Sequence, residues 1–351
     1  MQTIIMDMRE KTDPEMIRRA GEILRSGGLV AFPTETVYGL GGNALDEASS
    51  AKIYAAKGRP SDNPLIVHIE RLEDLELLVT EIPQSALILA QAFWPGPLTM
   101  ILPKSPIVPD TTTGGLKTVA VRMPNHPAAL ELIRAAGGFV AAPSANTSGR
   151  PSPTSAAHVI EDLDGRIDCI IDGGSVGIGL ESTIVDLTGE TPEILRPGYI
   201  SRAMLEEVLG KVTVDKGLTS EDEKVRPRAP GMKYRHYAPK AQLAIVEGEE
   251  NDVVRTIQEL VRKDTAAGLK VGIIAAIESA GRYGEGTVRA AGTRSDERTI
   301  AMHLYALLRE FDELETDRIY SEAFEEGQLG DAIMNRLLKA AGHHVIRAEK
   351  M

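Results

Sequence analysis

The sequence predicts an α/β protein whose first domain has a twisted, at least partly parallel sheet and whose second domain is a smaller α/β unit. Short apolar runs alternate with segments in which apolar residues recur at helical spacing. A stretch rich in proline and charge, residues 211–240, interrupts this alternation. We therefore expect domains at residues 1–210 and 241–351, joined by a linker at 211–240.

The first domain is expected to begin with a helix. Thr12-Asp13-Pro14-Glu15 matches a capping box, an apolar face runs from Met16 to Leu24, and Gly27-Gly28 ends the helix. Further helices are expected around 50–57, 85–93 and 127–136. The predicted strands are 29–32, 65–69, 98–102, 119–122, 139–142, 169–172 and 182–186.

The alternation resumes after the linker. Predicted strands are 243–246, 270–275 and 318–323, and predicted helices are 252–262, 300–311 and 331–341. This order is typical of a Rossmann-like unit.

The composition favours a cytoplasmic location. No apolar run is long enough to span a bilayer, and the N-terminus lacks the apolar block of a signal peptide. The single cysteine, Cys169, excludes a disulfide framework, and no Cys/His cluster indicates zinc. Because Cys169 lies in an apolar run, we expect a buried structural thiol.

The charge is unevenly distributed. The net charge is -12, but residues 224–240 contain six basic and no acidic residues. An acidic protein is a poor general binder of nucleic acid, because affinity for phosphate backbones comes from cations. The basic linker is therefore open to three interpretations: a tether to RNA, a strap over an anionic ligand, or a solvated connector.

Polar residues and glycine follow the ends of several apolar strands, where ligands bind in open α/β sheets. Lys57 and Arg59 lie on a loop stiffened by glycine and proline and can contact several phosphate oxygens. The small and hydroxyl residues of 141–152 can form an anion-binding nest. Two further segments have this character. Segment 33–40, taken alone, is best interpreted as a helix N-terminus, and segment 179–186 is followed by Arg196.

Familiar nucleotide motifs are missing. The sequence contains no G-x-x-x-x-G-K-[ST] loop, and residues 174–179 do not match G-x-G-x-x-G. The sequence shows no pattern typical of a Ser-His-Asp triad or of a metal site. His68 lies inside an apolar strand and is either a core residue or a residue that contacts a ligand. The residues alone thus indicate an α/β protein with a donor-rich anion pocket.

Taken together, the polar segments resemble a known family. The segments are PTETVYGL (33–40), KGRPSDNPLIVHI (57–69), PSANTSGRPSPT (143–154), ESTIVDL (181–187) and RPGYI (196–200). They resemble the YrdC-like domain of threonylcarbamoyl-AMP synthases, and PGMKYRHYAP (230–239) resembles the connector of the two-domain members. The resemblance implies a twisted mixed sheet with flanking helices.

The resemblance also implies a reaction: L-threonine, bicarbonate and ATP give threonylcarbamoyl-AMP, pyrophosphate and water. The product would supply the threonylcarbamoyl group for modification of a tRNA adenosine next to the anticodon. By position, threonine would contact Thr34, His68, Arg122, Ala142 and Ser182. ATP would contact Lys57, Arg59, Ser61, Thr118, Ser144, Asn146, Ser152, Arg196 and Tyr234.

In this scheme Lys57 and Arg59 act in catalysis by neutralising charge, and Mg²⁺ is bound through the ATP phosphates rather than by protein ligands. We assign no general base. The linker segment 224–240 is expected to act as a lid. The expected partner is the transferase that passes the product on to tRNA, whereas direct tRNA binding by this chain stays open.

Three alternatives accompany this interpretation. One is a non-catalytic RNA-binding translation or ribosome-assembly factor, against which the acidic first domain counts. Another is a carbamoyl-transfer enzyme, since related domains occur in hydrogenase-maturation proteins, but the single cysteine excludes their zinc fingers. The third is an unrelated metabolic α/β enzyme whose loops match by chance.

Overall fold

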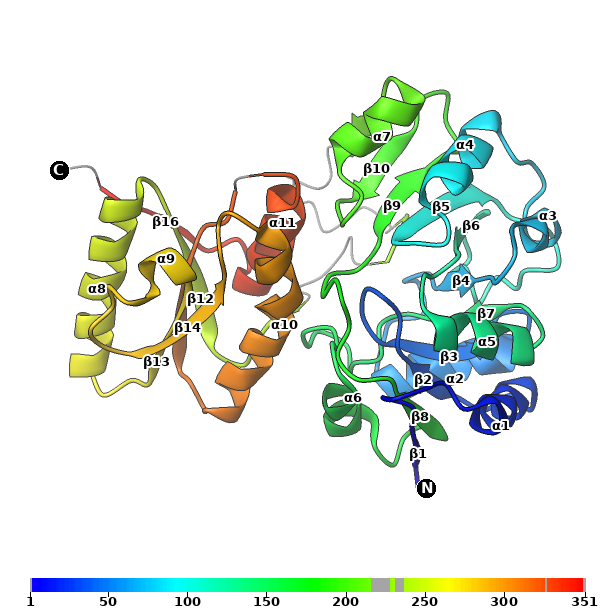
Figure 1. The fold of residues 1–351 in the computed structure, drawn as a ribbon, viewed down its shortest axis with the longest axis horizontal. Coiled ribbons are helices and arrows are strands. Elements are labelled where there is room, and N and C mark those ends of the chain that lie inside the picture. The colour runs from blue at the N-terminus through cyan, green and yellow to red at the C-terminus, as the bar shows by residue number, and fades with distance from the viewer. Residues whose placement is uncertain (1, 216–227, 231–236, 326, 350–351) are drawn as a thin grey trace. The chain divides into compact units, whose positions relative to one another are not determined.

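A computed structural model describes residues 2–215, 228–230, 237–325 and 327–349 (Figure 1). The chain divides into two compact units, each with its own sheet. Among the described residues, 2–148, 152–177 and 181–230 belong to the first unit. The second unit consists of 149–151, 178–180 and the residues from 237 onward.

The first unit is built on a mixed sheet of order β1-β8-β2-β3-β7-β4-β6-β5-β9-β10-β11. Its central pairs β4–β6 and β5–β9 are parallel, whereas β4–β7 and β5–β6 are antiparallel. The strands are β1 (Ile4–Asp7), β2 (Val30–Phe32), β3 (Gly39–Asn43), β4 (Ile66–His68), β5 (Leu98–Pro103), β6 (Thr118–Arg122), β7 (Val140–Ala141), β8 (Cys169–Asp172), β9 (Thr183–Asp186), β10 (Glu193–Arg196) and β11 (Thr213–Val214). The predicted α/β class with a mixed sheet is confirmed.

The helices of this unit begin at side-chain caps where the sequence supplies them. Asp13, not Thr12, caps the first helix: its carboxylate accepts from the backbone N–H groups of Glu15 and Met16. The prediction was one residue off because Pro14 occupies the first helical position. The helices are α1 (Pro14–Arg25), α2 (Glu47–Lys57), η1 (Leu72–Asp74), α3 (Leu75–Leu78), α4 (Gln84–Phe93), α5 (Pro127–Ala135), α6 (Ala156–Leu163) and α7 (Arg202–Leu209).

Segment 33–40 does not begin a helix, so that interpretation of the segment is wrong. It turns the chain from β2 into β3, which pairs antiparallel with β2. The glycine-rich strand Gly39–Asn43 has little strand propensity of its own and is held by pairing on both sides.

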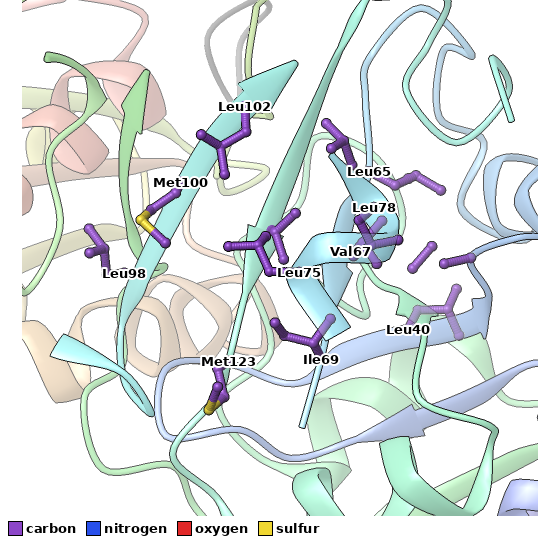
Figure 2. Close-up of a cluster of buried hydrophobic side chains, with 14 of the residues drawn as sticks. Leu40, Leu65, Val67, Ile69, Leu75, Leu78, Leu98, Met100, Leu102 and Met123 are labelled. Carbon is purple, nitrogen blue, oxygen red and sulfur yellow. The ribbon is translucent and has the colours of Figure 1, made fainter. Parts of the chain in front are cut away.

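The two faces of the central strands differ in character. Val67 and Met100 lie on one face, in a large apolar cluster with Leu75 and Leu78 (Figure 2). Because side chains alternate along a strand, the neighbours of Val67 and Met100 on β4 and β5 point to the opposite face; these are Ile66, His68, Thr99 and Ile101. On that face a small apolar cluster contains Ile66, Ile101, Ala120, Ile184, Leu195 and Ala229. This second face also carries polar residues, among them His68 and Arg122, and it bears the candidate site.

The second unit has a parallel sheet of order β14-β13-β15-β12-β16. Its strands are β12 (Gln242–Glu247), β13 (Val271–Ala276), β14 (Thr287–Gly292), β15 (Arg318–Glu322) and β16 (Val345–Arg347). Its helices are α8 (Glu250–Ala266), α9 (Ile277–Ala280), α10 (Glu297–Glu313) and α11 (Gly330–Ala341). The predicted parallel α/β rhythm is confirmed, although the sequence did not predict β14 and β16.

The second unit also incorporates residues 149–151, taken from within the segment 143–154. Arg309 of α10 is fully buried and donates from Nε and Nη2 to the Pro151 carbonyl, at 3.2 and 2.7 Å. The Ala238 amide donates to the Gly149 carbonyl at 2.9 Å. No helix among the described residues combines the length and apolar character needed to cross a membrane.

Candidate functional site

Strand register places several predicted site residues in one row across the first sheet. His68 on β4 lies opposite Arg122 on β6, and Arg122 lies opposite Thr99 on β5. Thr99 lies opposite Ile184 on β9, and Ile184 lies opposite Arg196 on β10. Directly opposed residues share a face of the sheet. His68, Arg122 and Thr99 therefore point to the face that bears the small apolar cluster.

Arg122 is a buried cation at the end of β6. Its side chain is 5% exposed, and its Nη2 lies 2.7 Å from Oε1 of Glu35, whose side chain is 14% exposed. Nε of Arg122 makes a long contact of 3.4 Å with the Gly96 carbonyl. The N–H groups of Nη2 do not point at the carboxylate, so the two side chains form an ion pair without a hydrogen bond.

His68 is held as a neutral imidazole. Burial, with the nearby Arg122 charge, lowers the pKa of His68 to about 3. Its Nδ1 lies 3.2 Å from the Ile66 carbonyl, and its ring meets Phe32 edge-on at 6.2 Å between centroids. A carbonyl only accepts hydrogen bonds, so Nδ1 carries the proton and Nε2 is left as an acceptor. His68 can therefore receive a hydrogen bond from a hydroxyl group of a ligand.

Lys57 is buried at the last position of α2. The following residue, Gly58, has a φ of 61°, the left-handed conformation that ends the helix. The ammonium of Lys57 donates to the Ser144 carbonyl at 2.5 Å and to the Asn146 carbonyl. Ser144 bridges to Gly39, so this loop also lies beside segment 33–40.

The loop after α2 positions Arg59. Its Nε and Nη2 contact the carbonyls of Asn63 and Pro64, at 3.3 and 3.1 Å. Ser61 on the same loop is exposed. Asn63 is buried, yet neither its side-chain oxygen nor its side-chain nitrogen has a hydrogen-bond partner within the described part of the chain.

Arg196 and Ser182 form a second polar group at the other end of the row. The Ser182 hydroxyl lies 2.7 Å from that of Thr99. Arg196 donates to the Ser182 carbonyl and hydroxyl, and its Nη1 lies 3.2 Å from the Pro230 carbonyl. Because Thr99 is directly opposite Arg122, this group adjoins the ion pair described above.

The remaining predicted residues occupy varied positions. The Thr34 hydroxyl is engaged locally, with the Val37 carbonyl at 2.7 Å. The Ala142 amide donates to the Ile66 carbonyl at 2.8 Å, so a backbone contact to a ligand would come from its carbonyl. Thr118 begins β6 and is partly buried, and the buried Ser152 hydroxyl donates to Glu181. Tyr234 lies outside the described residues.

Several buried polar atoms have no hydrogen bond within the described residues. Both oxygens of Glu35, Nη2 of Arg122 and Nδ1 of His126 belong to the ion pair on this row and its surroundings. Both side-chain polar atoms of Asn63, Oδ1 of Asp62, Oδ2 of Asp74 and Oγ1 of Thr111 are the same kind of atom away from the row. None of the described residues from 152 onward has such an atom. Native proteins pair nearly all buried polar groups, so unmet ones indicate a place where a ligand completes the bonding.

Glu35 and His126, and the buried Asn63 on the loop after α2, are candidate site residues that the sequence did not single out. Glu35 and Asn63 stand within segments 33–40 and 57–69, so their polar character was visible there. His126, just before α5, had no such signal; burial lowers its pKa while Glu35 opposes the shift. Cys169, by contrast, is buried as predicted, and burial raises its pKa to about 12.

Comparison with known proteins assigns both units. The Sua5/YciO/YrdC family model, described as telomere recombination, matches residues 22–198. The model described as the C-terminal domain of threonylcarbamoyl-AMP synthase matches residues 200–342.

Relatives match over nearly the whole chain. The threonylcarbamoyl-AMP synthase of Pyrococcus abyssi is 51% identical, covering 98% of this chain and 99% of its own. That of Bacillus subtilis is also 51% identical, covering 98% and 97%. The crystal structure of P. abyssi Sua5 complexed with L-threonine matches with a TM-score of 0.95 at 50% identity, covering 99% of this chain and all of that one. The chain therefore belongs to the threonylcarbamoyl-AMP synthase family, in its two-domain form.

Proposed function

We propose that this chain condenses L-threonine, bicarbonate and ATP to threonylcarbamoyl-AMP, pyrophosphate and water. Threonylcarbamoyl-AMP is the precursor for modification of an adenosine in tRNA. One observation carries the proposal beyond family membership. Buried cations and hydroxyls follow one row of the first sheet from Arg122 through Thr99 and Ser182 to Arg196. Lys57 holds the neighbouring loop 144–146, whose Ser144 bridges to Gly39 at the end of segment 33–40.

Threonine fits the part of the row around β4 and β6. Arg122 is a buried guanidinium suited to the threonine carboxylate. His68 offers Nε2 as an acceptor for the threonine hydroxyl. Thr34, Ser182 and the Ala142 carbonyl complete the proposed set, and the P. abyssi protein in its threonine complex is a close relative of this chain.

The nucleotide fits the loops that flank the row. Lys57 and Arg59 bring positive charge to the loops that carry Ser61, Ser144 and Asn146. Phosphoryl transfer requires positioning and charge neutralisation more than a protein nucleophile, so we assign no general base. Thr118, Ser152 and Arg196 stay assigned to ATP as part of the proposal, with Mg²⁺ carried on its phosphates.

The lid proposal gains support from the described part of the linker. Ala229 is fully buried in the small apolar cluster with Ile66 and Ile184, on the face of the sheet that carries His68. The carbonyl of its neighbour Pro230 faces Arg196. Residues 224–227 and 231–236 lie outside the described residues.

An Ala229→Asp variant tests the lid, because a carboxylate is unfavourable in this apolar cluster. We expect slower adenylate formation and faster loss of the product to hydrolysis, at unchanged secondary structure. Product that is formed and retained as in the wild type would refute the lid.

A direct assay tests the activity itself. The full chain is incubated with ATP, Mg²⁺, bicarbonate and labelled threonine, and pyrophosphate and a threonine-bearing adenylate are measured. Omitting threonine or bicarbonate should abolish both products. Turnover of carbamoyl phosphate in place of threonine would favour the carbamoyl-transfer alternative.

Binding of tRNA with no threonine-dependent use of ATP would favour the RNA-binding factor, which the full-length relatives named as synthases do not support. We further propose a cytoplasmic location and a transferase partner that consumes the adenylate.

A further inference from the structure

The ion pair between Glu35 and Arg122 is the feature of the site that the proposed contacts do not use. We propose that Glu35 binds the α-ammonium group of threonine, so that Glu35 and Arg122 together recognise the amino acid as a zwitterion. This inference rests on the proposed function, since it assumes that threonine is the amino acid bound at Arg122.

The first argument is the bonding state of the Glu35 carboxylate. Both of its oxygens are sealed from solvent, and among the described residues neither accepts a hydrogen bond. Leaving such a buried acceptor unmet costs about 1–3 kcal/mol, more when it is charged. An ammonium group offers three donors and a positive charge, so it would satisfy these oxygens.

The second argument is the distance between the two charged side chains. Nη2 of Arg122 lies 2.7 Å from Oε1 of Glu35. An α-amino acid carries its carboxylate and ammonium on one carbon, so a site for it needs a cation and an anion side by side. The two side chains supply this arrangement, and each opposite charge of the ligand would face a partner.

The third argument concerns the rigidity of the two partners. Arg122 is fixed by the pairing of β6 with β4 and β5. Glu35 follows Thr34, whose hydroxyl contacts the Val37 carbonyl and the Thr36 hydroxyl and so fixes the loop. His126 also faces Glu35, but as a neutral ring at pH 7, because burial lowers its pKa. Arg122 is thus the cation that Glu35 contacts in the described structure, and a second cation, the ligand's ammonium, would be favourable there.

Two simpler roles for Glu35 compete with this one. The carboxylate could merely hold Arg122 in place, or it could occupy the guanidinium as a stand-in that threonine must displace. The three roles differ in how a neutral residue at this position changes the affinity for ligands with and without an ammonium group.

Calorimetric titration of the full chain and of Glu35→Gln with two ligands separates these roles. The ligands are L-threonine and 3-hydroxybutanoate, which is threonine without its amine. We expect Glu35→Gln to weaken threonine binding roughly 30-fold or more, because the loss of a buried charge partner has at least this effect. We expect the same variant to bind 3-hydroxybutanoate more tightly than the wild type does, because a repelling carboxylate is removed.

Each other outcome overturns the inference. Weaker binding of both ligands would indicate that Glu35 only positions Arg122, and tighter binding of both would indicate a stand-in carboxylate. Unchanged binding of both would show that Glu35 has no part in recognition. If the wild type binds no threonine at all, the proposed function itself fails, which is a distinguishable result.

Two further variants guard the interpretation. Glu15→Gln removes a carboxylate from an exposed ion pair with Arg18 on α1 and should change neither affinity. Glu35→Asp keeps the charge but shortens the side chain, so it should retain discrimination against 3-hydroxybutanoate while binding threonine less tightly. Fluorescence of Trp94, the single tryptophan, checks that the first unit is folded in each variant.

Discussion

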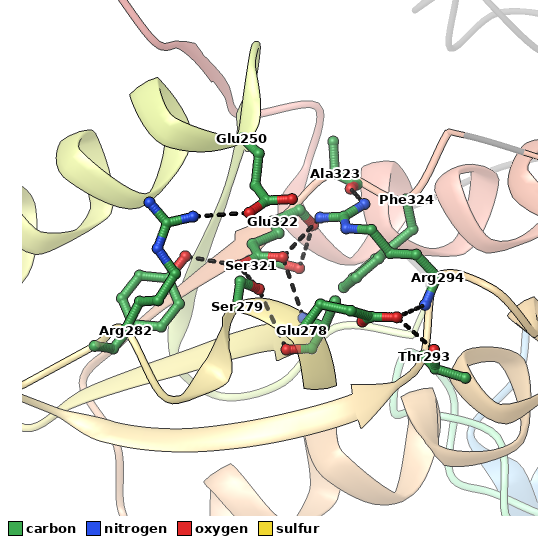
Figure 3. A network of polar contacts seen from close by, with 12 residues as sticks. Glu250, Glu278, Ser279, Arg282, Thr293, Arg294, Ser321, Glu322, Ala323 and Phe324 are labelled. Atoms are coloured by element: carbon green, nitrogen blue, oxygen red, sulfur yellow. Dashed lines mark hydrogen bonds and ion pairs between the residues drawn. The ribbon is translucent and has the colours of Figure 1, made fainter.

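Two glutamates, one in each unit, have carboxylate oxygens that are shielded from solvent, and they illustrate how a candidate site differs from a structural network. Glu322 ends β15 of the second unit and is fully buried. It accepts from the Ser279 hydroxyl at 2.5 Å, the Tyr283 hydroxyl at 2.7 Å, the Ala276 amide at 3.1 Å and Arg294 at 2.7 Å (Figure 3). The carboxylate of Glu35 in the first unit makes an ion pair with Arg122 and accepts no hydrogen bond from any residue that the structure describes.

The surroundings of Glu322 complete the contrast. Arg294, its cationic partner, also donates to the Ala323 carbonyl at 3.1 Å and lies 5.4 Å from the centre of the Phe324 ring. Each oxygen of this carboxylate thus accepts two hydrogen bonds from donors of the same unit. A charged residue at the carboxyl end of a parallel strand is by itself no sign of a ligand. The number of unmet hydrogen bonds is the better indicator.

The largest expected effect is on the reaction rate and comes from Lys57, whose ammonium group contacts the loop 144–146. Lys57→Met should lower the rate of adenylate formation on the order of 100-fold or more, because removing one preorganised charge stabiliser has this size of effect. The rate of pyrophosphate release measures it. Lys52→Met on the same helix is the matched control, since the Lys52 ammonium donates to the Gly27 carbonyl outside the site. Equal losses in both variants would contradict the account.

The Glu322 network should affect stability instead of chemistry. Glu322→Ala leaves Arg294 without its buried partner. Breaking a buried pair costs about 3–5 kcal/mol, and we expect the lower end of this range because the Arg294 side chain is 27% exposed. Hydrogen exchange of β13 and β15 should therefore become faster, while threonine affinity below the unfolding temperature stays that of the wild type. Glu315→Ala, which removes an exposed ion pair with Lys270, should leave exchange unchanged. Lost threonine binding in Glu322→Ala would place a ligand-binding role in the second unit.

His68 should make the first unit less stable in acid. Its pKa is lowered to about 3 in the folded protein, so the unfolded chain binds more protons below the ordinary value of 6.5. The stability that the neutral imidazole provides is fully present above pH 6.5 and is lost as the pH falls toward 3. Between pH 7 and pH 5 the free energy of unfolding should fall by about 2 kcal/mol, at about 1.4 kcal/mol per pH unit below 6.5.

Urea unfolding followed by Trp94 fluorescence measures this loss in the first unit. His68→Asn should flatten the pH dependence by that amount. An identical dependence in wild type and variant would contradict the neutral, buried imidazole.

The smallest expected effect concerns a helix cap. Asp46 accepts from the Ala48 and Ser49 amides at the start of α2, which ends at Lys57. Asp46→Ala should cost about 1 kcal/mol of stability. Asp13→Ala removes the equivalent cap of α1, which carries no proposed site residue. Urea unfolding should show similar losses, with a reduced adenylation rate in Asp46→Ala alone; a reduced rate in both would argue against a specific role for α2.

Much of the fold could be predicted because local patterns and tertiary structure agree. Apolar runs predicted the strand at Cys169–Asp172, and the spacing of apolar residues predicted the helix that ends at Lys57. The strand Gly39–Asn43 was not, since its glycines form a strand only through pairing with β2 and β7. Residues 149–151 belong to the second unit although they lie within the sequence range of the first, and a single boundary placed along the sequence cannot predict this.

The site was predicted in part, for a related reason. Polar residues next to strand ends, such as Lys57 and Arg122, stand out in the sequence. The family resemblance stated from those segments is confirmed by the full-length relatives. The pairing of Glu35 with Arg122 depends on the register of the sheet and on the turn after β2, which no local pattern encodes. The individual ligand contacts therefore stay predictions.

The most direct test of the account is a calorimetric titration with threonine of the wild type, Arg122→Met and Glu322→Ala. If the residues with unmet hydrogen bonds form the site, Arg122→Met should weaken binding on the order of 100-fold or more, because a buried charge partner of the ligand is lost. Glu322→Ala should bind threonine as the wild type does, although it is less stable. Retained binding in Arg122→Met, or loss of binding in Glu322→Ala alone, would contradict the account.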